Sequence, residues 1–148
     1  MITRRPAAYQ DADFVFEVKK DALRPYYDPL SNWEDGDKRE LFRLAFEPRE
    51  TSIIQLDGQD IGVLVLVETP AMLALSEIYV LTAYQNRGIG TSIIQDILAE
   101  ADARQVPVTL HVMKANPACE LYWRLGFATT QESDDFYEMI RMPSRPDG

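Results

Sequence analysis

The segment Y-Q-N-R-G-I-G-T, residues Tyr84 to Thr91, joins a predicted strand to the longest predicted helix of the chain. The strand is expected over residues 73–81. The helix is expected over residues 88–104, where isoleucine, leucine and alanine recur at helical spacing. Backbone N–H groups at the start of a helix have no partner within it, and the helix dipole adds positive potential there. Because two glycines let a ligand approach the backbone closely, the segment predicts a phosphate site.

The charge around this segment agrees with an anion site. Residues 78–95 contain no acid and one base, Arg87, although the average composition predicts about three acids. A buried strand and a buried helix face also exclude charge, so this alternative stays open. Two other phosphate motifs are excluded. No Gly-Lys-Ser/Thr follows the glycines, and Ile93 stands where a dinucleotide fingerprint requires its third glycine.

The rest of the chain predicts an α/β fold with a mixed sheet of about six to seven strands and helices on both faces. The period of the apolar residues changes from helical to alternating several times along the sequence. In chain order we expect a strand at Met1–Arg5, a helix capped by Asp11 or Asp13 and ending near Leu23, a helix through Leu41 to Ala45, a hairpin of Thr51–Leu56 and Ile61–Val67 around Asp57-Gly58, a strand at Val106–Met113, a helix started by Asn116-Pro117 and ended by Gly126, and strands at Phe127–Thr129 and Phe136–Met142. The strand, helix, strand order around residues 73–113 implies a parallel crossover.

Composition limits the classes of partner. The 148 residues carry 15 Lys and Arg against 24 Asp and Glu, a formal charge of −9, which disfavours nucleic acid and anionic membranes and favours neutral or cationic partners. We expect one domain over residues 1–142 and a flexible tail at residues 143–148. Without an apolar span, a secretory signal or a second cysteine beside Cys119, the simplest location is the cytoplasm. An exposed sheet edge makes a homodimer plausible, but nothing in the sequence specifies one.

Two motifs resemble those of the GCN5-related N-acetyltransferases. The run Gln85-Asn86-Arg87-Gly88-Ile89-Gly90 is similar to the family's pyrophosphate loop, Gln/Arg-x-x-Gly-x-Gly/Ala. About 30 residues later, Asn116 and the run Leu121-Tyr122-Trp123-Arg124-Leu125-Gly126-Phe127 resemble the family's Asn … Leu-Tyr-x-x-x-Gly-Phe signature. The predicted order of elements is also the family's, so the resemblance covers nearly the whole chain.

This resemblance implies acetyl-CoA as co-substrate, bound where two parallel strands splay apart, and no metal. The strand before the loop would pair its backbone with the pantetheine, the loop amides would bind the pyrophosphate, the asparagine would contact coenzyme A, and the tyrosine would lie near the thioester sulfur. The implied cofactor-binding residues are Ile78, Tyr79, Val80, Gln85, Asn86, Arg87, Gly88, Ile89, Gly90, Thr91, Asn116 and Tyr122.

Acetyl transfer to an amine needs a neutral nitrogen, a polarised carbonyl and a proton for the departing thiolate. We expect direct attack in a ternary complex, with Tyr122 as general acid. Three alternatives are open for the base. Glu77 shares a strand face with Tyr79, and His111 stands where part of the family has an acidic base. The third alternative is a water without a dedicated base. No base is adjacent to Cys119, so we expect it to pack in the core.

The acceptor side is less defined. In the family the first two helices and their loop commonly wall the acceptor pocket. Here that region carries Tyr26, Tyr27 and Trp33 together with Glu34, Asp35 and Asp37. Aromatic faces and carboxylates suit a cationic amine, although a solvated acidic loop explains the same residues.

The leading hypothesis from the sequence is an N-acetyltransferase that acts on a primary amine of a small molecule or a peptide. One alternative is a non-catalytic acyl-CoA-binding sensor or interaction module. A third reading is a domain that binds the phosphates of another nucleotide.

Overall fold

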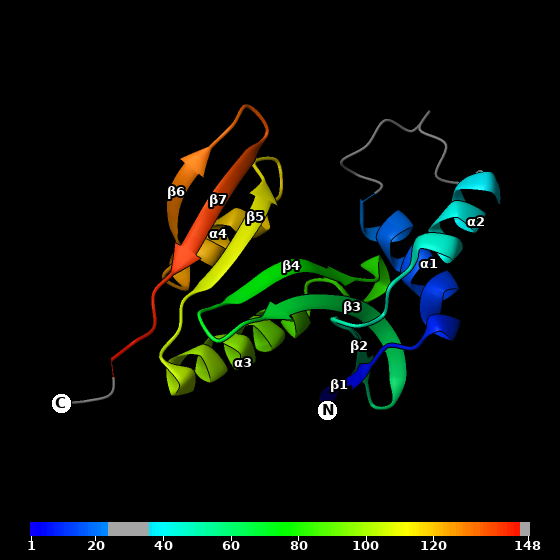
Figure 1. Cartoon of the computed structure of the whole chain (residues 1–148), viewed down its shortest axis with the longest axis horizontal. Coiled ribbons are helices and arrows are strands. Elements are labelled where there is room, and N and C mark those ends of the chain that lie inside the picture. The colour runs from blue at the N-terminus through cyan, green and yellow to red at the C-terminus, as the bar shows by residue number, and fades with distance from the viewer. Residues whose placement is uncertain (24–35, 146–148) are drawn as a thin grey trace. The chain divides into compact units, whose positions relative to one another are not determined.

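The computed structural model describes residues 1–23 and 36–145. Its helices and strands occur in the predicted order (Figure 1). They are β1 (Ile2–Pro6), α1 (Ala12–Leu23), α2 (Gly36–Ala45), β2 (Thr51–Leu56), β3 (Gln59–Glu68), β4 (Leu73–Val80), α3 (Ile89–Arg104), β5 (Val108–Met113), α4 (Ala118–Arg124), β6 (Ala128–Glu132) and β7 (Phe136–Arg141).

The strands form a seven-stranded sheet in the order β1-β2-β3-β4-β5-β7-β6. β4 pairs with β5 in parallel, whereas β1–β2, β2–β3, β5–β7 and β6–β7 are antiparallel pairs. The predicted mixed α/β sheet and its parallel crossover are therefore confirmed. The chain forms two compact units, Met1–Val65 with Glu77–Gly90, and Leu66–Ser76 with Thr91–Gly148. The single domain over residues 1–142 stays a prediction.

The first unit contains the predicted hairpin of β2 and β3. Its turn residues Asp57 and Gly58 both have positive φ, 50° and 85°. This is the backbone of a two-residue turn that matches the twist of the flanking strands, and Asp-Gly is a favoured pair for it. The hairpin prediction is confirmed because the turn chemistry is local.

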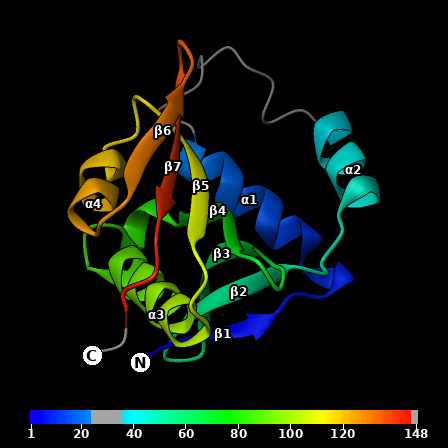
Figure 2. The same ribbon diagram turned by 60° about the vertical axis from the view of Figure 1, so that its left-hand side comes forward.

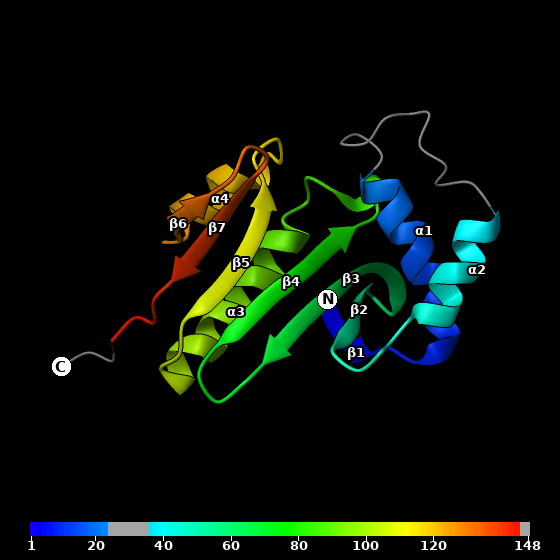
Figure 3. The ribbon, with the colours of Figure 1, turned by 45° about the horizontal axis from the view of Figure 1, so that its top comes forward.

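Helix α1 packs its apolar face on this hairpin. Val15 and Val18 of α1 form a buried cluster with Ile53 of β2 and Val63 of β3. Helix α2 lies beside α1 (Figure 3), and the ring of Phe42 lies 5.5 Å from that of Phe16. The apolar residues that predicted the two helices are thus the residues that bury them.

The start of α1 differs from the prediction in one detail. A short 3-10 turn, Tyr9–Asp11, precedes the helix. The Asp11 carboxylate accepts the amide of Ala8 at 2.8 Å and pairs with Arg5 at 2.9 Å, so it stabilises this turn. Asp13 lies inside the helix and pairs with Arg43.

In the second unit, β5, β7 and β6 lie side by side (Figure 2). In this unit β4 and β5 are in register from Leu73 opposite Val108. The C-terminal end of α3 is held to β7, because Arg141 pairs with Asp102 at 2.5 Å. Ser144 donates its amide to the same Asp102 carboxylate at 2.8 Å. None of the helices within residues 1–23 and 36–145 is long and apolar enough to cross a membrane.

Candidate functional site

The predicted phosphate loop is a turn between β4 and α3, in the first unit. Helix α3 begins at Ile89, within one residue of the predicted start. Two loop residues have left-handed backbone, Asn86 with φ 64° and Gly88 with φ 78°. Asparagine and glycine are the residues that adopt this conformation at least cost. The loop sequence therefore fits the turn that brings the chain onto the helix.

The amides of this loop are free to bind a ligand. Within the described chain, no hydrogen bond engages the N–H groups of residues 86–88. The first amides of α3 lack partners by helix geometry. A Cβ atom built on Gly88 or Gly90 would meet nothing within 4 Å. Packing therefore does not require glycine at either position, and the open space beside the backbone fits the close approach of a phosphate.

The side chains of the loop hold it in place. The Gln85 side-chain amide donates to the Val80 carbonyl at 2.9 Å. The Arg87 guanidinium lies 5.2 Å from the centre of the Tyr84 ring, in a cation–π contact. Gln85 thus fastens the loop to the end of β4, and exposed Arg87 supplies a positive charge at the loop.

The residues of β4 that precede the loop are Ile78, Tyr79 and Val80. Tyr79 is partly buried and packs on the cluster formed by α1, β2 and β3. Glu77, one of the candidate bases, pairs with Lys19 of α1 at 2.9 Å. Glu77 and Tyr79 thus both contact residues of the α1 side, as strand alternation predicts.

Asn116 lies in the second unit, just before α4. Its Oδ1 atom accepts the amide of Ala118 at 2.9 Å, and the helix begins at Ala118. The predicted cap is therefore displaced by one residue, because Pro117 occupies the N-cap position itself. No described residue accepts a hydrogen bond from the Asn116 side-chain N–H₂ group, which leaves two donors for a ligand.

Tyr122 is 5% exposed, and its ring packs edge-on against Phe127 with the centroids 5.6 Å apart. Burial raises the pKa of Tyr122 to about 12. Within the described residues its hydroxyl makes no hydrogen bond, and no fully buried side-chain N or O atom lacks a partner. The hydroxyl therefore keeps access to solvent while its ring is buried.

Cys119 precedes Tyr122 on α4. Its buried thiol donates to the carbonyl of Met113 at 3.5 Å, and burial raises the pKa of the thiol. Because the thiolate is the nucleophile, a buried thiol of raised pKa is not activated for attack. Cys119 packs in the core, as expected.

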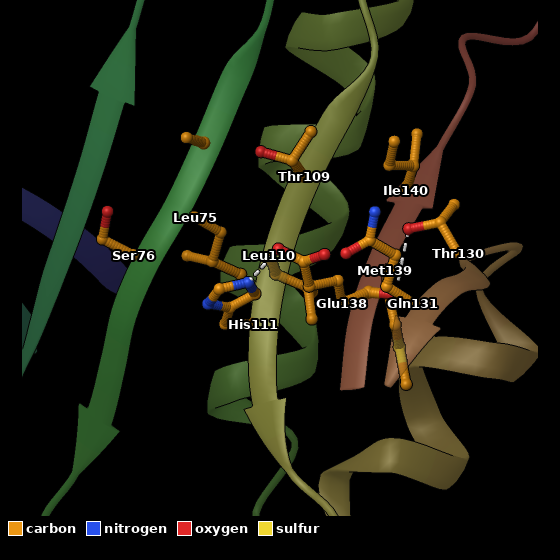
Figure 4. A pocket seen from close by; sticks show the side chains of 11 residues that line it. Leu75, Ser76, Thr109, Leu110, His111, Thr130, Gln131, Glu138, Met139 and Ile140 are labelled. Carbon is orange, nitrogen blue, oxygen red and sulfur yellow. Dashed lines mark hydrogen bonds and ion pairs between the residues drawn. The ribbon is translucent and has the colours of Figure 1, made fainter. Parts of the chain in front are cut away.

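His111 and Glu138 face one another across β5 and β7 (Figure 4). Their atoms Nε2 and Oε1 lie 2.5 Å apart. Both residues line an open groove of about 560 Å³ on the second unit. The other lining residues are neutral: Ala74, Leu75, Ser76, Thr109, Leu110, Thr130, Gln131, Met139 and Ile140. No local pattern in the sequence points to Glu138, because its partner is fixed by strand register and not by local spacing.

The predicted acceptor residues Tyr26, Tyr27 and Trp33 lie outside the described residues, as do Glu34 and Asp35. In the described part of the chain, no three His, Cys, Asp or Glu side chains are grouped so that they could hold a metal ion.

Comparison with known proteins gives one family match and many structural ones. Residues 15–127 match the family described as Acetyltransferase (GNAT) family. No curated protein matches the chain.

Three solved structures illustrate the similarity of fold. PaiA N-acetyltransferase from Thermoplasma acidophilum, in complex with coenzyme A, has a TM-score of 0.71 at 15% identity, over 96% of this chain and 99% of that one. Ribosomal-protein-S18-alanine N-acetyltransferase from Escherichia coli has a TM-score of 0.71 at 20% identity, over 99% and 97%. N-acetylglutamate synthase from Neisseria gonorrhoeae, complexed with coenzyme A and N-acetyl-glutamate, has a TM-score of 0.68 at 15% identity, over 98% and 36%.

Proposed function

Because the chain belongs to the GNAT family of acetyltransferases, we propose that it transfers the acetyl group of acetyl-CoA to a primary amine of a small molecule or a peptide. The observation that carries this proposal is the loop before α3. It combines the family's sequence pattern with unengaged amides and with two glycines whose Cβ positions are open. Two of the similar structures contain coenzyme A, one of them together with N-acetyl-glutamate, and a third is named for an alanine of ribosomal protein S18.

The loop amides of residues 86–91 would hold the pyrophosphate of acetyl-CoA, whereas the amide of Gln85 already donates to the Thr82 carbonyl. Diphosphate oxygens accept hydrogen bonds from such amides, and the positive end of the α3 dipole adds to the attraction. Exposed Arg87 adds a positive charge whose contribution falls with salt. Backbone groups of Ile78, Tyr79 and Val80 would pair with the pantetheine, and the free amide donors of Asn116 would bind the cofactor.

Tyr122 would act as the general acid. The neutral amine attacks the thioester carbonyl, the N–C bond forms, and the C–S bond breaks to release a thiolate. The Tyr122 hydroxyl has no partner among the described residues and stays protonated at neutral pH, so it can donate to that thiolate. The phenol then regains a proton that the new amide nitrogen loses to solvent.

Of the two side chains considered as the base beside a water, His111 is the better supported. Glu77 is already paired with Lys19, and a carboxylate that takes a proton would lose that ion pair. His111 is exposed and lines a groove, so its imidazole can contact an acceptor amine there. The cytoplasmic location and the homodimer stay predictions from the sequence.

The test is to incubate the protein with acetyl-CoA and a panel of primary amines, small molecules and peptides, while free thiol is followed. We expect thiol release that depends on one class of amine. Folded protein that binds coenzyme A but releases no thiol with any amine would favour the non-catalytic acyl-CoA-binding alternative. Calorimetry with coenzyme A, ATP and NAD distinguishes a nucleotide-binding domain of another kind, which would prefer ATP or NAD.

A further inference from the structure

His111 and Glu138 are joined by the sheet itself. They stand directly opposite one another in the antiparallel pairing of β5 and β7, and Nε2 lies 2.5 Å from Oε1. The side chains are 65% and 41% exposed, so both can contact a ligand from solvent. Because each residue is in a strand with backbone partners, their relative placement is more precise than a pair of loop residues would allow.

The backbone at Glu138 is also held from its other side. β6 pairs with β7 through a bulge between Thr129 and Gln131, and Gln131 stands opposite Glu138. Thr130, the bulged residue, donates its hydroxyl to the Glu138 carbonyl at 3.3 Å. Bulges re-aim side chains and are frequent beside functional sites. Here the bulge places Thr130 and Gln131 along the same groove as the pair.

Among the described residues that line the groove, only His111 and Glu138 have ionisable side chains. The volume of about 560 Å³ lies within the range of sites for small molecules. Of these lining residues, His111 and Glu138 are therefore the ones that can exchange a proton with a ligand in the groove.

From this arrangement we propose that Glu138 is the positioning residue for His111, and that the groove receives the acceptor amine. This inference rests on the proposed acetyltransferase function. Glu138 Oε1 accepts the Nε2–H of His111, which fixes the tautomer with the lone pair on Nδ1. Nδ1 has no partner in the described part of the chain, so it is free to act as the base.

In each turnover His111 takes up one proton from the acceptor and releases it to solvent. Nδ1 takes a proton from the acceptor ammonium, R–NH₃⁺, and gives the neutral amine and an imidazolium that the Glu138 carboxylate stabilises. The amine attacks acetyl-CoA and forms the N–C bond as the C–S bond breaks. The products are the acetamide, coenzyme A with its thiol protonated, and one proton that His111 releases to solvent.

The first test is spectroscopic and needs no enzyme activity. Because His111 is the only histidine of the chain, its ring resonances can be assigned directly. The ring resonances of His111 are followed by NMR in the wild type, in Glu138→Gln and in the matched control Glu132→Gln. Glu132 is a carboxylate on β6 that pairs with Lys114 at 3.2 Å and does not line the groove. We expect Glu138→Gln to move the resonances and Glu132→Gln to leave them in place. If the His111 ring resonances did not move in Glu138→Gln, the proposal would be overturned.

The second test is kinetic. We expect Glu138→Gln to lower kcat about 10-fold or more, with KM for acetyl-CoA unchanged, and Glu138→Asp to recover part of the loss. His111→Ala should lower kcat about 100-fold or more, and imidazole in the buffer should restore part of the activity. Adding Glu138→Gln to His111→Ala should not lower kcat further.

Two outcomes separate the failures of the two proposals. Additive losses in the double variant, or an equal loss in Glu132→Gln, would contradict the role of Glu138 while leaving acetyl transfer intact. A wild-type protein that releases no thiol with any amine would refute the proposed function and, with it, the role of His111 as the base. The NMR result would still decide whether the side chains of His111 and Glu138 are in contact.

Discussion

The side-chain amide of Gln85 donates a 2.9 Å hydrogen bond to the carbonyl of Val80, the last residue of β4. Two backbone hydrogen bonds lie within the same stretch, from Tyr84 to Leu81 and from Gln85 to Thr82. The start of the loop is thus tied to the end of β4 by one hydrogen bond, and the two backbone bonds order the turn that follows the strand. A loop that is ordered before a ligand arrives loses less conformational freedom on binding, which strengthens the affinity.

Gln85→Ala should therefore weaken coenzyme A binding. Loss of one hydrogen bond is worth about 0.5–1.5 kcal/mol, or roughly 2- to 12-fold in Kd. Calorimetry with coenzyme A measures it, and Gln95→Ala is the control, because Gln95 is exposed on α3. Equal affinities for the wild type and Gln85→Ala would show that the bond does not order the binding loop.

Gly90→Leu should separate binding from stability. Gly90 has no positive φ, and its Cβ position is open, so leucine fits the helix and is a better helix former by up to about 1 kcal/mol. The protein should melt at the same or a higher temperature, yet coenzyme A binding should be lost because the side chain fills the place of the phosphate. Thermal melts and calorimetry on the same sample measure both.

Gly88→Val tests the same site with a different control. Gly88 and Gly58 both have positive φ and open Cβ positions, so either substitution strains the backbone. Gly58 lies in the β2–β3 turn. Both variants should lose stability to a similar degree, but only Gly88→Val should abolish coenzyme A binding. If Gly58→Val impaired binding equally, the effect would reflect general destabilisation.

Tyr122→Phe should lower kcat about 100-fold while the Kd for coenzyme A is unchanged, since a phenol that donates only to the thiolate contributes to the rate and not to binding. Tyr137→Phe is the control on β7. Because the pKa of Tyr122 is raised to about 12, its proton is retained well above neutral pH. The wild-type kcat should therefore show no loss from Tyr122 ionisation below about pH 11. A decline near pH 10 that Tyr122→Phe removes would contradict this assignment.

The Arg5 cluster should make folding sensitive to acid. Hydrogen bonds from Arg5 hold the pKa values of Asp11 and Asp60 below their ordinary values. A folded pKa below the unfolded one gives stability that is present above about pH 4 and is lost as the pH falls through the folded values. Arg5→Ala should cost about 1–3 kcal/mol of unfolding free energy at pH 7, with a smaller difference below about pH 4.

Urea unfolding at pH 7 and at pH 3 measures this difference. Arg49→Ala serves as the control, since Arg49 is exposed and no described ion pair uses its side chain. A difference between Arg5→Ala and the wild type that did not change with pH would show that the aspartates are not the source of the stability.

Local patterns in the sequence account for the elements and for the loop. Helix α3 follows from isoleucines at helical spacing, and the β2–β3 turn follows from Asp57-Gly58, because periodicity and positive φ are properties of a few neighbouring residues. The prediction that Gly88 lies at a phosphate site rests on a local pattern of the same kind. The requirement for glycine at position 62 could not be predicted, because it arises from another strand. A Cβ atom on Gly62 would lie 2.5 Å from the Tyr79 carbonyl oxygen.

The sequence by itself thus determined the α/β order of elements and the resemblance to a family of acetyltransferases, and it predicted the phosphate loop. It left the base open between Glu77, His111 and a water without a dedicated base. Only the tertiary structure shows that Glu77 pairs with Lys19 and that Glu138 meets His111 across 27 residues of chain, and our proposal of His111 as the base rests on these two contacts. Such contacts depend on which strands pair and in which register. That choice is made by the packing of the whole sheet and leaves no local pattern to read.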